Sequence, residues 1–141
     1  MTSMERPFSR VLDRLKDAGL RPTRQRLALA KLLAEAGDCH MTAEQLHAQS
    51  QGAGIRVSLA TVYNTLHQFT DVGLLRQVAV DGSKTYFDTN TTMHHHFFVE
   101  GENALVDIPG AEEIVGRMPV APEGYDIARI DVVVRLRRKG K

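Results

Sequence analysis

Hydrophobic residues recur every three or four positions through the first half of the chain, which is the spacing of one face of an α-helix. This spacing predicts four helices, near residues 6–20, 23–37, 42–52 and 58–73. Thr42 and Ser58 are predicted N-caps, because a hydroxyl oxygen can accept a hydrogen bond from a first-turn N–H. Glycines lie at the end of all four segments, as is common where a helix stops.

The fourth predicted helix has two distinct faces. At 100° per residue, its apolar side chains fall within an arc of about 80°. These are Leu59, Val62, Leu66 and Phe69. Asn64 lies opposite this stripe, among small and uncharged polar residues, and Tyr63 lies at its margin. An amide on such a face can pair with adenine in the major groove, so this helix is a candidate DNA-reading element.

The pattern changes to alternation after the fourth helix. Residues 74–80 and 84–89 flank "DGS", which predicts a β-hairpin. Further on, residues 96–100 and 104–108 read as strands around "GEN", residues 112–118 as a short helix, and residues 125–138 as a long strand. In that last strand Ile130, Val132, Val134 and Leu136 are predicted to alternate inward.

These elements predict an α+β fold in two domains. Helices followed by a hairpin are typical of a winged helix-turn-helix, so residues 1–89 are the predicted DNA-binding domain. Residues 90–141 form a predicted α/β domain for dimerisation and ligand sensing. Three strands and one helix bury too little apolar surface alone, so this half is expected to pair with a second copy.

Composition narrows the classes of protein that fit. The 43% hydrophobic and 25% charged residues are typical of a folded soluble chain. No apolar run approaches the ~20 residues of a membrane span, and the N-terminal residues lack a signal-peptide pattern. The single cysteine, Cys39, excludes an internal disulfide and a zinc site built from paired cysteines. A cytoplasmic protein is expected.

A net charge of +1 conceals two basic clusters, "RPTRQR" and "RLRRKGK". The first lies at the start of the second helix and is interpreted as a contact with DNA phosphates. The second, at the C-terminus, fits either a solvated surface or a DNA contact.

Three of the six histidines stand together at positions 94–96. On a strand His94 and His96 share a face and His95 points away, so the first two form a pair of nitrogen ligands. Asp88, Asp107 and His40 are the candidate remaining ligands. Nitrogen and oxygen donors without sulfur favour Fe(II) or Mn(II) and also accept Zn(II).

Other interpretations of these residues stay open. His94 and His96 also fit an ordinary solvent-facing strand, His40 a polar residue beside a helix, and the two aspartates turn positions. A hydrolytic metalloenzyme would need a general base and a pocket for which the sequence offers no residues, so no enzyme is predicted. A dimeric DNA-binding module without a ligand is a further alternative.

Four motifs in this order resemble the ferric uptake regulator superfamily. They are "GLRPTRQRLALAKLLAE", "HMTAEQLH", "SLATVYNTLHQFTDVGLL" and "KTYFD" followed by "HHH", and "ATVYNTL" is the most specific. The resemblance covers about residues 10–138. It implies a dimer with an N-terminal winged helix, a C-terminal α/β dimerisation domain, and a regulatory metal that sets the angle of the DNA-binding heads.

The resemblance also implies roles for individual residues. The sensory metal shell falls on His40, Asp88, His94, His96 and Asp107. The base-contacting tyrosine falls on Tyr63 and the arginine near the second helix on Arg21. With Thr61, Asn64 and Ser58, these two are the predicted contacts to an AT-rich, roughly palindromic operator in double-stranded DNA.

Departures from the family pattern point to one branch. Val99 and Glu102 stand where most members have the first Cys-X-X-Cys pair, the C-terminal pair is missing, and Ile130 replaces an expected histidine. No structural zinc with four cysteines is therefore expected. The chain is most similar to the iron response regulators (Irr), in which such histidine runs are implicated in binding haem.

In that interpretation His94, His95 and His96 are candidate haem ligands, although no Cys-Pro haem motif is present. The prediction is a dimeric regulator of iron homeostasis responding to haem or Fe(II)/Mn(II). A peroxide-sensing or manganese-responsive repressor of the same family is the alternative.

Overall fold

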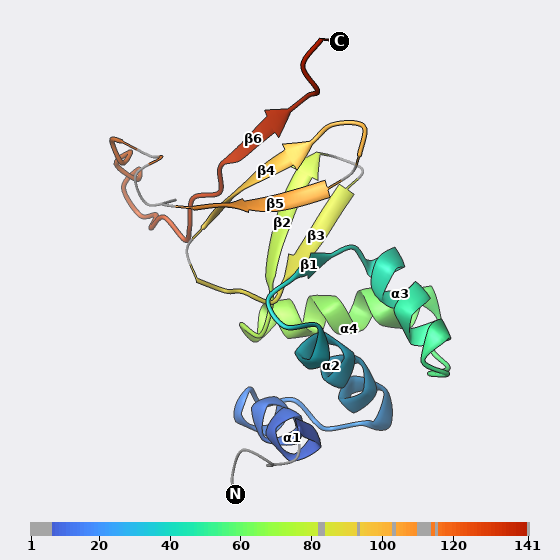
Figure 1. Ribbon diagram of the computed structural model, residues 1–141. Coiled ribbons are helices and arrows are strands. Elements are labelled where there is room, and N and C mark those ends of the chain that lie inside the picture. Colours follow the sequence, from blue (N-terminus) through green and yellow to red (C-terminus); the bar gives the residue numbers. More distant parts are fainter. Residues whose placement is uncertain are drawn as a thin grey trace, which may run out of the picture. The chain divides into compact units, whose positions relative to one another are not determined.

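The computed structural model describes residues 7–81, 84–92, 94–102, 104–109, 114 and 116–140, apart from the side chains of residues 7–9, 81 and 84. Contacts divide the chain into two compact units, Met1–Thr91 and Thr92–Lys141. The predicted boundary lies two residues earlier. Each unit contains a three-stranded sheet, and helices α1 to α4 belong to the first unit (Figure 1).

Four helices occur in the predicted order. They are α1 (Pro7–Asp17), α2 (Arg24–Ala36), α3 (Ala43–Gly52) and α4 (Leu59–Asp71). The predicted N-caps are confirmed: the Thr42 hydroxyl accepts from Gln45 N at 3.1 Å, and the Ser58 hydroxyl accepts from Thr61 N at 3.1 Å. Gln45 also returns a side-chain contact to the Thr42 backbone, which completes a capping box. Within the described residues, no helix is long and apolar enough to cross a membrane.

The sheet of the first unit has the strand order β1-β3-β2. Strands β2 (Arg76–Asp81) and β3 (Lys84–Asp88) are antiparallel, as the predicted hairpin requires. Gly82 and Ser83 of its predicted turn lie outside the described residues. The third strand, β1 (His40–Met41), was not predicted, because two residues are too few to show an alternating pattern. It makes β3 the central strand.

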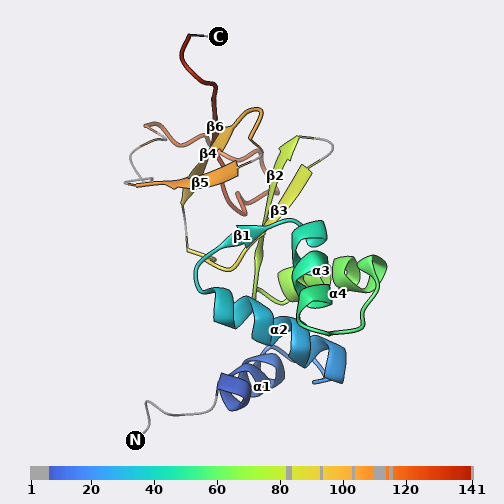
Figure 2. The same cartoon turned by 45° about the vertical axis from the view of Figure 1, so that its right-hand side comes forward.

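The core of the first unit joins all four helices to the sheet. Its fully buried members include Leu15, Leu29, Leu46, Leu66, Phe69 and Phe87. The buried stripe predicted for α4 is confirmed for Val62, Leu66 and Phe69. It is wrong for Leu59, which is 36% exposed, because this first residue of α4 lies at the end of the helix and outside the core cluster. Figure 2 shows α3 lying against α4.

The sheet of the second unit has the strand order β5-β4-β6. Strands β4 (His95–Val99) and β5 (Ala104–Ile108) are antiparallel, and β6 (Val133–Leu136) runs parallel to β4. Phe98 and Leu105 lie opposite each other in the ladder and are both buried. The histidine run therefore lies at the start of the central strand of this sheet.

Two expectations for the second unit need correction. The long strand predicted over residues 125–138 is only four residues, and Val134 and Leu136 are exposed rather than buried. Strand β6 pairs with β4 along one edge. In the described part of the chain, the sheet face that carries Val134 and Leu136 is exposed. Of the helix predicted over residues 112–118, residues 112, 113 and 115 lie outside the described part, and residues 116–118 are not helical.

Candidate metal centre

Two histidines and one carboxylate converge on one face of the second sheet. Antiparallel pairing places Asp107 on β5 directly opposite His96 on β4, and His94 lies two residues before His96 on the same side. The Nε2 atoms of His94 and His96 lie 3.6 Å and 3.3 Å from Asp107 Oδ1. Potential ligand atoms of all three lie within 4.8 Å of one another. These donors are close enough to share one ion.

The hydrogen bond of His94 determines which of its nitrogens is available. Its Nδ1 lies 2.7 Å from the backbone oxygen of Thr92. Because a carbonyl can only accept, Nδ1 carries the hydrogen, and in the neutral imidazole Nε2 presents its lone pair to Asp107. Two acceptor atoms then face each other, an arrangement that a cation stabilises. Metal-binding histidines commonly donate their second N–H to a carbonyl in this way.

His95 has a different environment. Its Nδ1 accepts a hydrogen bond from the backbone N–H of Val132 at 3.0 Å, so the side chain connects β4 to the segment before β6. The ring is buried and points away from His94 and His96, as alternation along the strand predicts. The side chains of the three consecutive histidines therefore do not all point to one side of the sheet.

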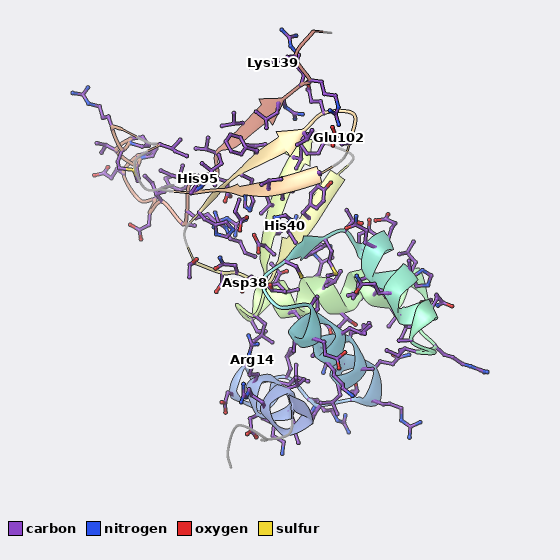
Figure 3. All side chains as sticks on the ribbon, viewed as in Figure 1. Arg14, Asp38, His40, His95, Glu102 and Lys139 are labelled. Carbon is purple, nitrogen blue, oxygen red and sulfur yellow. The ribbon has the colours of Figure 1, made fainter. Side chains whose placement is uncertain are left out.

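The other two predicted ligands lie together in the first unit. Strand pairing places His40 on β1 opposite Asp88 on β3. Figure 3 labels the side chain of His40. The sequence predicted no strand at His40. In the structure, Thr89 N donates to Cys39 O and Cys39 N donates to Thr89 Oγ1, both at 2.9 Å, and these bonds hold β1 against the end of β3.

Asp88 is nearly fully buried, and its Oδ1 accepts a hydrogen bond from Asn90 N at 2.9 Å. On its other side the ladder places Arg76 of β2 opposite it, also buried. Asp88 thus lies in the ladder between His40 and Arg76. Sequence reasoning did not select Arg76. The signal available was a charged residue within the otherwise apolar strand "LLRQVAV".

Cys39 directly precedes His40. Partial burial raises the pKa of its thiol above the ordinary value, a hydrogen bond with Thr89 acts against this rise, and the nearby Asp88 and Asp38 carboxylates add to it. The thiol is therefore protonated near neutral pH.

The predicted DNA-contacting residues occupy two places on the first unit. Arg21, Thr61 and Asn64 line one hollow of about 360 Å³ between the start of α2 and α4. Arg26 crosses this hollow: its Nε and Nη2 donate to Gln68 Oε1 at 3.2 Å and 3.0 Å, and its Nη1 donates to Arg21 O at 2.8 Å. These bonds hold the Arg21 backbone beside α4, a role for Arg26 that the sequence did not predict.

The other two predicted DNA contacts have partners away from this hollow. The Ser58 hydroxyl caps α4 and also donates to Thr61 Oγ1 at 3.0 Å. The Tyr63 hydroxyl donates to Glu44 Oε2 on α3 at 3.1 Å. Ser58 is thus occupied in holding the helix terminus, while Tyr63 lies on the side of α4 that faces α3.

Comparisons with known proteins agree with this architecture. The model of the ferric uptake regulator family matches residues 17–134. The ferric uptake regulation protein of Vibrio anguillarum is 38% identical over 85 residues, which span 60% of this chain and 57% of that protein. The peroxide-responsive repressor PerR of Staphylococcus aureus is 31% identical over 105 residues, 74% of this chain and 70% of that protein.

Among solved structures, the manganese-containing ferric uptake regulator of Pseudomonas aeruginosa superposes with a TM-score of 0.69 at 29% identity. This superposition covers 90% of the present chain and 96% of that one.

Proposed function

Because the chain belongs to the ferric uptake regulator family, we propose that it is a metal-responsive transcriptional regulator acting as a homodimer on DNA in the cytoplasm. Members of this family are transcriptional regulators and not enzymes. The observation that carries the proposal is the convergence of His94, His96 and Asp107, with a lone pair of His94 directed at a carboxylate oxygen. A divalent cation would satisfy these donors together.

In this proposal one ion takes ligands from both groups of residues. The first unit contributes His40 and Asp88, and the second contributes His94, His96 and Asp107. Three imidazoles and two carboxylates, without sulfur, suit Fe(II) or Mn(II) and accept Zn(II). The related Pseudomonas aeruginosa structure contains manganese. Asp88 and His94 are six positions apart in sequence, so a shared ion would restrict how the two units can be oriented.

DNA recognition is assigned to α4 and the start of α2. In a winged helix the last helix enters the major groove, so Thr61, Tyr63 and Asn64 would reach base edges. Asn64 suits adenine, which supports an AT-rich operator. Arg21 would contact phosphate, and the hydrogen bond from Arg26 to its carbonyl keeps it near α4. Ser58 would act at the helix terminus.

Dimerisation is assigned to the open face of the second sheet. Strand pairing places Phe97 beside both Val106 and Val134, and Val99 beside Leu136, so these apolar side chains share one face. Val106, Val134 and Leu136 are 49%, 37% and 38% exposed. An apolar sheet face without a covering layer is suited to a second copy of the same unit. Two copies would present two α4 helices to a palindromic operator.

Replacing Tyr63 with alanine tests the assignment of α4. We expect the affinity for a duplex selected from a randomised library to fall about 5- to 150-fold in the presence of Mn(II), because a direct base contact is removed. Fluorescence anisotropy at fixed salt measures this. The control is Tyr125→Ala, which removes a 73% exposed tyrosine of the second unit. Equal affinities of the Tyr63 variant and the wild type would assign recognition to another surface.

The histidine run is the proposed site at which the signal acts. We propose an iron response regulator in which haem or Fe(II)/Mn(II) binds there. The relative from Staphylococcus aureus is a peroxide-responsive repressor, which makes peroxide sensing the second candidate.

Two measurements separate these signals. If haem is the effector, titrating it into the metal-free protein will give a saturable Soret band near one haem per chain, lost when His94, His95 and His96 are all alanine. An unsaturable band that is equal in both proteins would exclude haem.

If peroxide is the signal, dilute peroxide will add one oxygen to a histidine-containing peptide of the Fe(II)-loaded protein, as mass spectrometry will detect. An unchanged mass would exclude that mechanism.

A further inference from the structure

The hydroxyl of Tyr63 has a defined direction. It lies 3.1 Å from Oε2 of Glu44, and an ionised carboxylate can only accept, so the tyrosine is the donor. A phenol has a single hydrogen. Once that hydrogen is directed at Glu44, the Tyr63 oxygen can only accept further hydrogen bonds. Burial raises the pKa of Tyr63, and the hydrogen bond with Glu44 and the charge of Glu44 raise it further, so the phenol remains protonated at neutral pH.

The ring of Tyr63 is held as well as its hydroxyl. It stacks on His67, one turn later in α4, with centroids 6.3 Å apart and planes inclined by 18°. His67 in turn packs against Phe87 in an edge-to-face contact at 5.4 Å, and Phe87 is completely buried. The tyrosine is therefore supported by the core of the first unit, so its orientation does not have to be established during binding.

Glu44 has a defined place at the start of a helix. It lies in the first turn of α3, where the positive end of the helix dipole stabilises negative charge. The capping box of Thr42 and Gln45 fixes the same turn. The Glu44 side chain is exposed, so its hydrogen bond with Tyr63 joins α3 to α4 at the protein surface.

We propose that Glu44 is a specificity-determining residue that acts through Tyr63. Bases differ in what they present in the major groove: adenine and cytosine carry an amino donor, whereas guanine and thymine carry a carbonyl acceptor. With its hydrogen directed at Glu44, the Tyr63 oxygen accepts from an amino group and repels a carbonyl. One position in each half-site is thereby restricted to adenine or cytosine. This inference rests on the proposed role of α4 in reading DNA.

Without Glu44 the hydroxyl can rotate and donate to a carbonyl as readily as it accepts from an amino group. The two changes that test this are Glu44→Gln, since an amide can itself donate to the phenol oxygen, and Tyr63→Phe, which keeps the ring and removes the oxygen. Glu35→Gln on α2 is the matched control, since it removes the same charge from an exposed position. Charge removal alone strengthens binding to all sequences alike.

Selection from a randomised duplex library, with Mn(II) present, measures base preference for each protein. We expect one position per half-site to prefer adenine or cytosine in the wild type and the Glu35 variant. In Glu44→Gln and in Tyr63→Phe this preference should fall about three- to tenfold, the value of one hydrogen bond, with no further fall in the double variant.

The outcomes separate the inference from the function on which it rests. If the wild type yields a motif and Glu44→Gln yields the same preferences at every position, the inference is wrong and DNA recognition stands. If the wild type retains no sequence above background, the proposed function and the inference both fail. Tyr63→Phe preserves the ring packing and serves as the test by itself if Glu44→Gln lowers the melting temperature.

Discussion

Replacing His94 and His96 together with alanine will abolish the response of DNA binding to metal. Both Nε2 atoms lie within 3.6 Å of Asp107 Oδ1, so the double change removes two of the three donors that converge in the second unit. Shifting operator occupancy from 10% to 90% requires a change in affinity of about 80-fold, or roughly 2.6 kcal/mol. We expect this difference between Mn(II)-loaded and metal-free protein to disappear.

The measurement is operator affinity with and without Mn(II) for the wild type, the double variant and His47→Ala. His47 is on α3, where its Nε2 contacts Gln51 at 3.3 Å, and it is not among the proposed ligands. It therefore controls for the loss of an imidazole as such. Circular dichroism should show an unchanged fold in the double variant. A full metal response in that variant would show that the sensor is elsewhere in the chain.

Replacing Phe87 with alanine will lower the free energy of unfolding by about 3–5 kcal/mol. Phe87 is completely buried in the central strand β3, and its ring also supports His67. The loss combines the transfer free energy of the ring with the cavity that remains, because close-packed neighbours relax only in part. Urea denaturation at a fixed protein concentration measures it, since the stability of a dimer depends on concentration.

Leu59→Ala is the control for this experiment. Leu59 is 36% exposed at the start of α4 and lies outside the core cluster, so we expect a loss under about 1 kcal/mol. Comparable losses at both positions would mean that the core of the first unit is not centred on β3.

Most of the first unit was accessible to sequence reasoning because its signals are local. Helix caps depend on residues three positions apart, so Thr42 and Ser58 could be identified without knowing the fold. The hairpin was equally visible, since β2 and β3 alternate on either side of a turn sequence. The exposure of Leu59 could not be predicted, because a helical wheel shows the direction of a side chain and not where the neighbouring core ends.

In the candidate metal centre too, some features follow from local sequence patterns and others depend on strand register. Alternation along a strand determined that His94 and His96 share a side and that His95 points away. Which carboxylate meets them depended on the register between β4 and β5, which pairs His96 with Asp107. Likewise His40 reached Asp88 only through β1, a strand too short for any periodic pattern.

For this protein the sequence alone determined the four helices of the first unit, the hairpin and the family, and it predicted the nitrogen and oxygen donors of the candidate metal centre. These follow from residue type and from spacings of a few positions. Tertiary structure decided the rest: the opposition of His40 and Asp88, the burial of Arg76 beside them, the open face of β6, and the hydrogen bond from Tyr63 to Glu44. Each joins residues far apart in the chain, and their distance is set by packing and strand register, which no local pattern encodes.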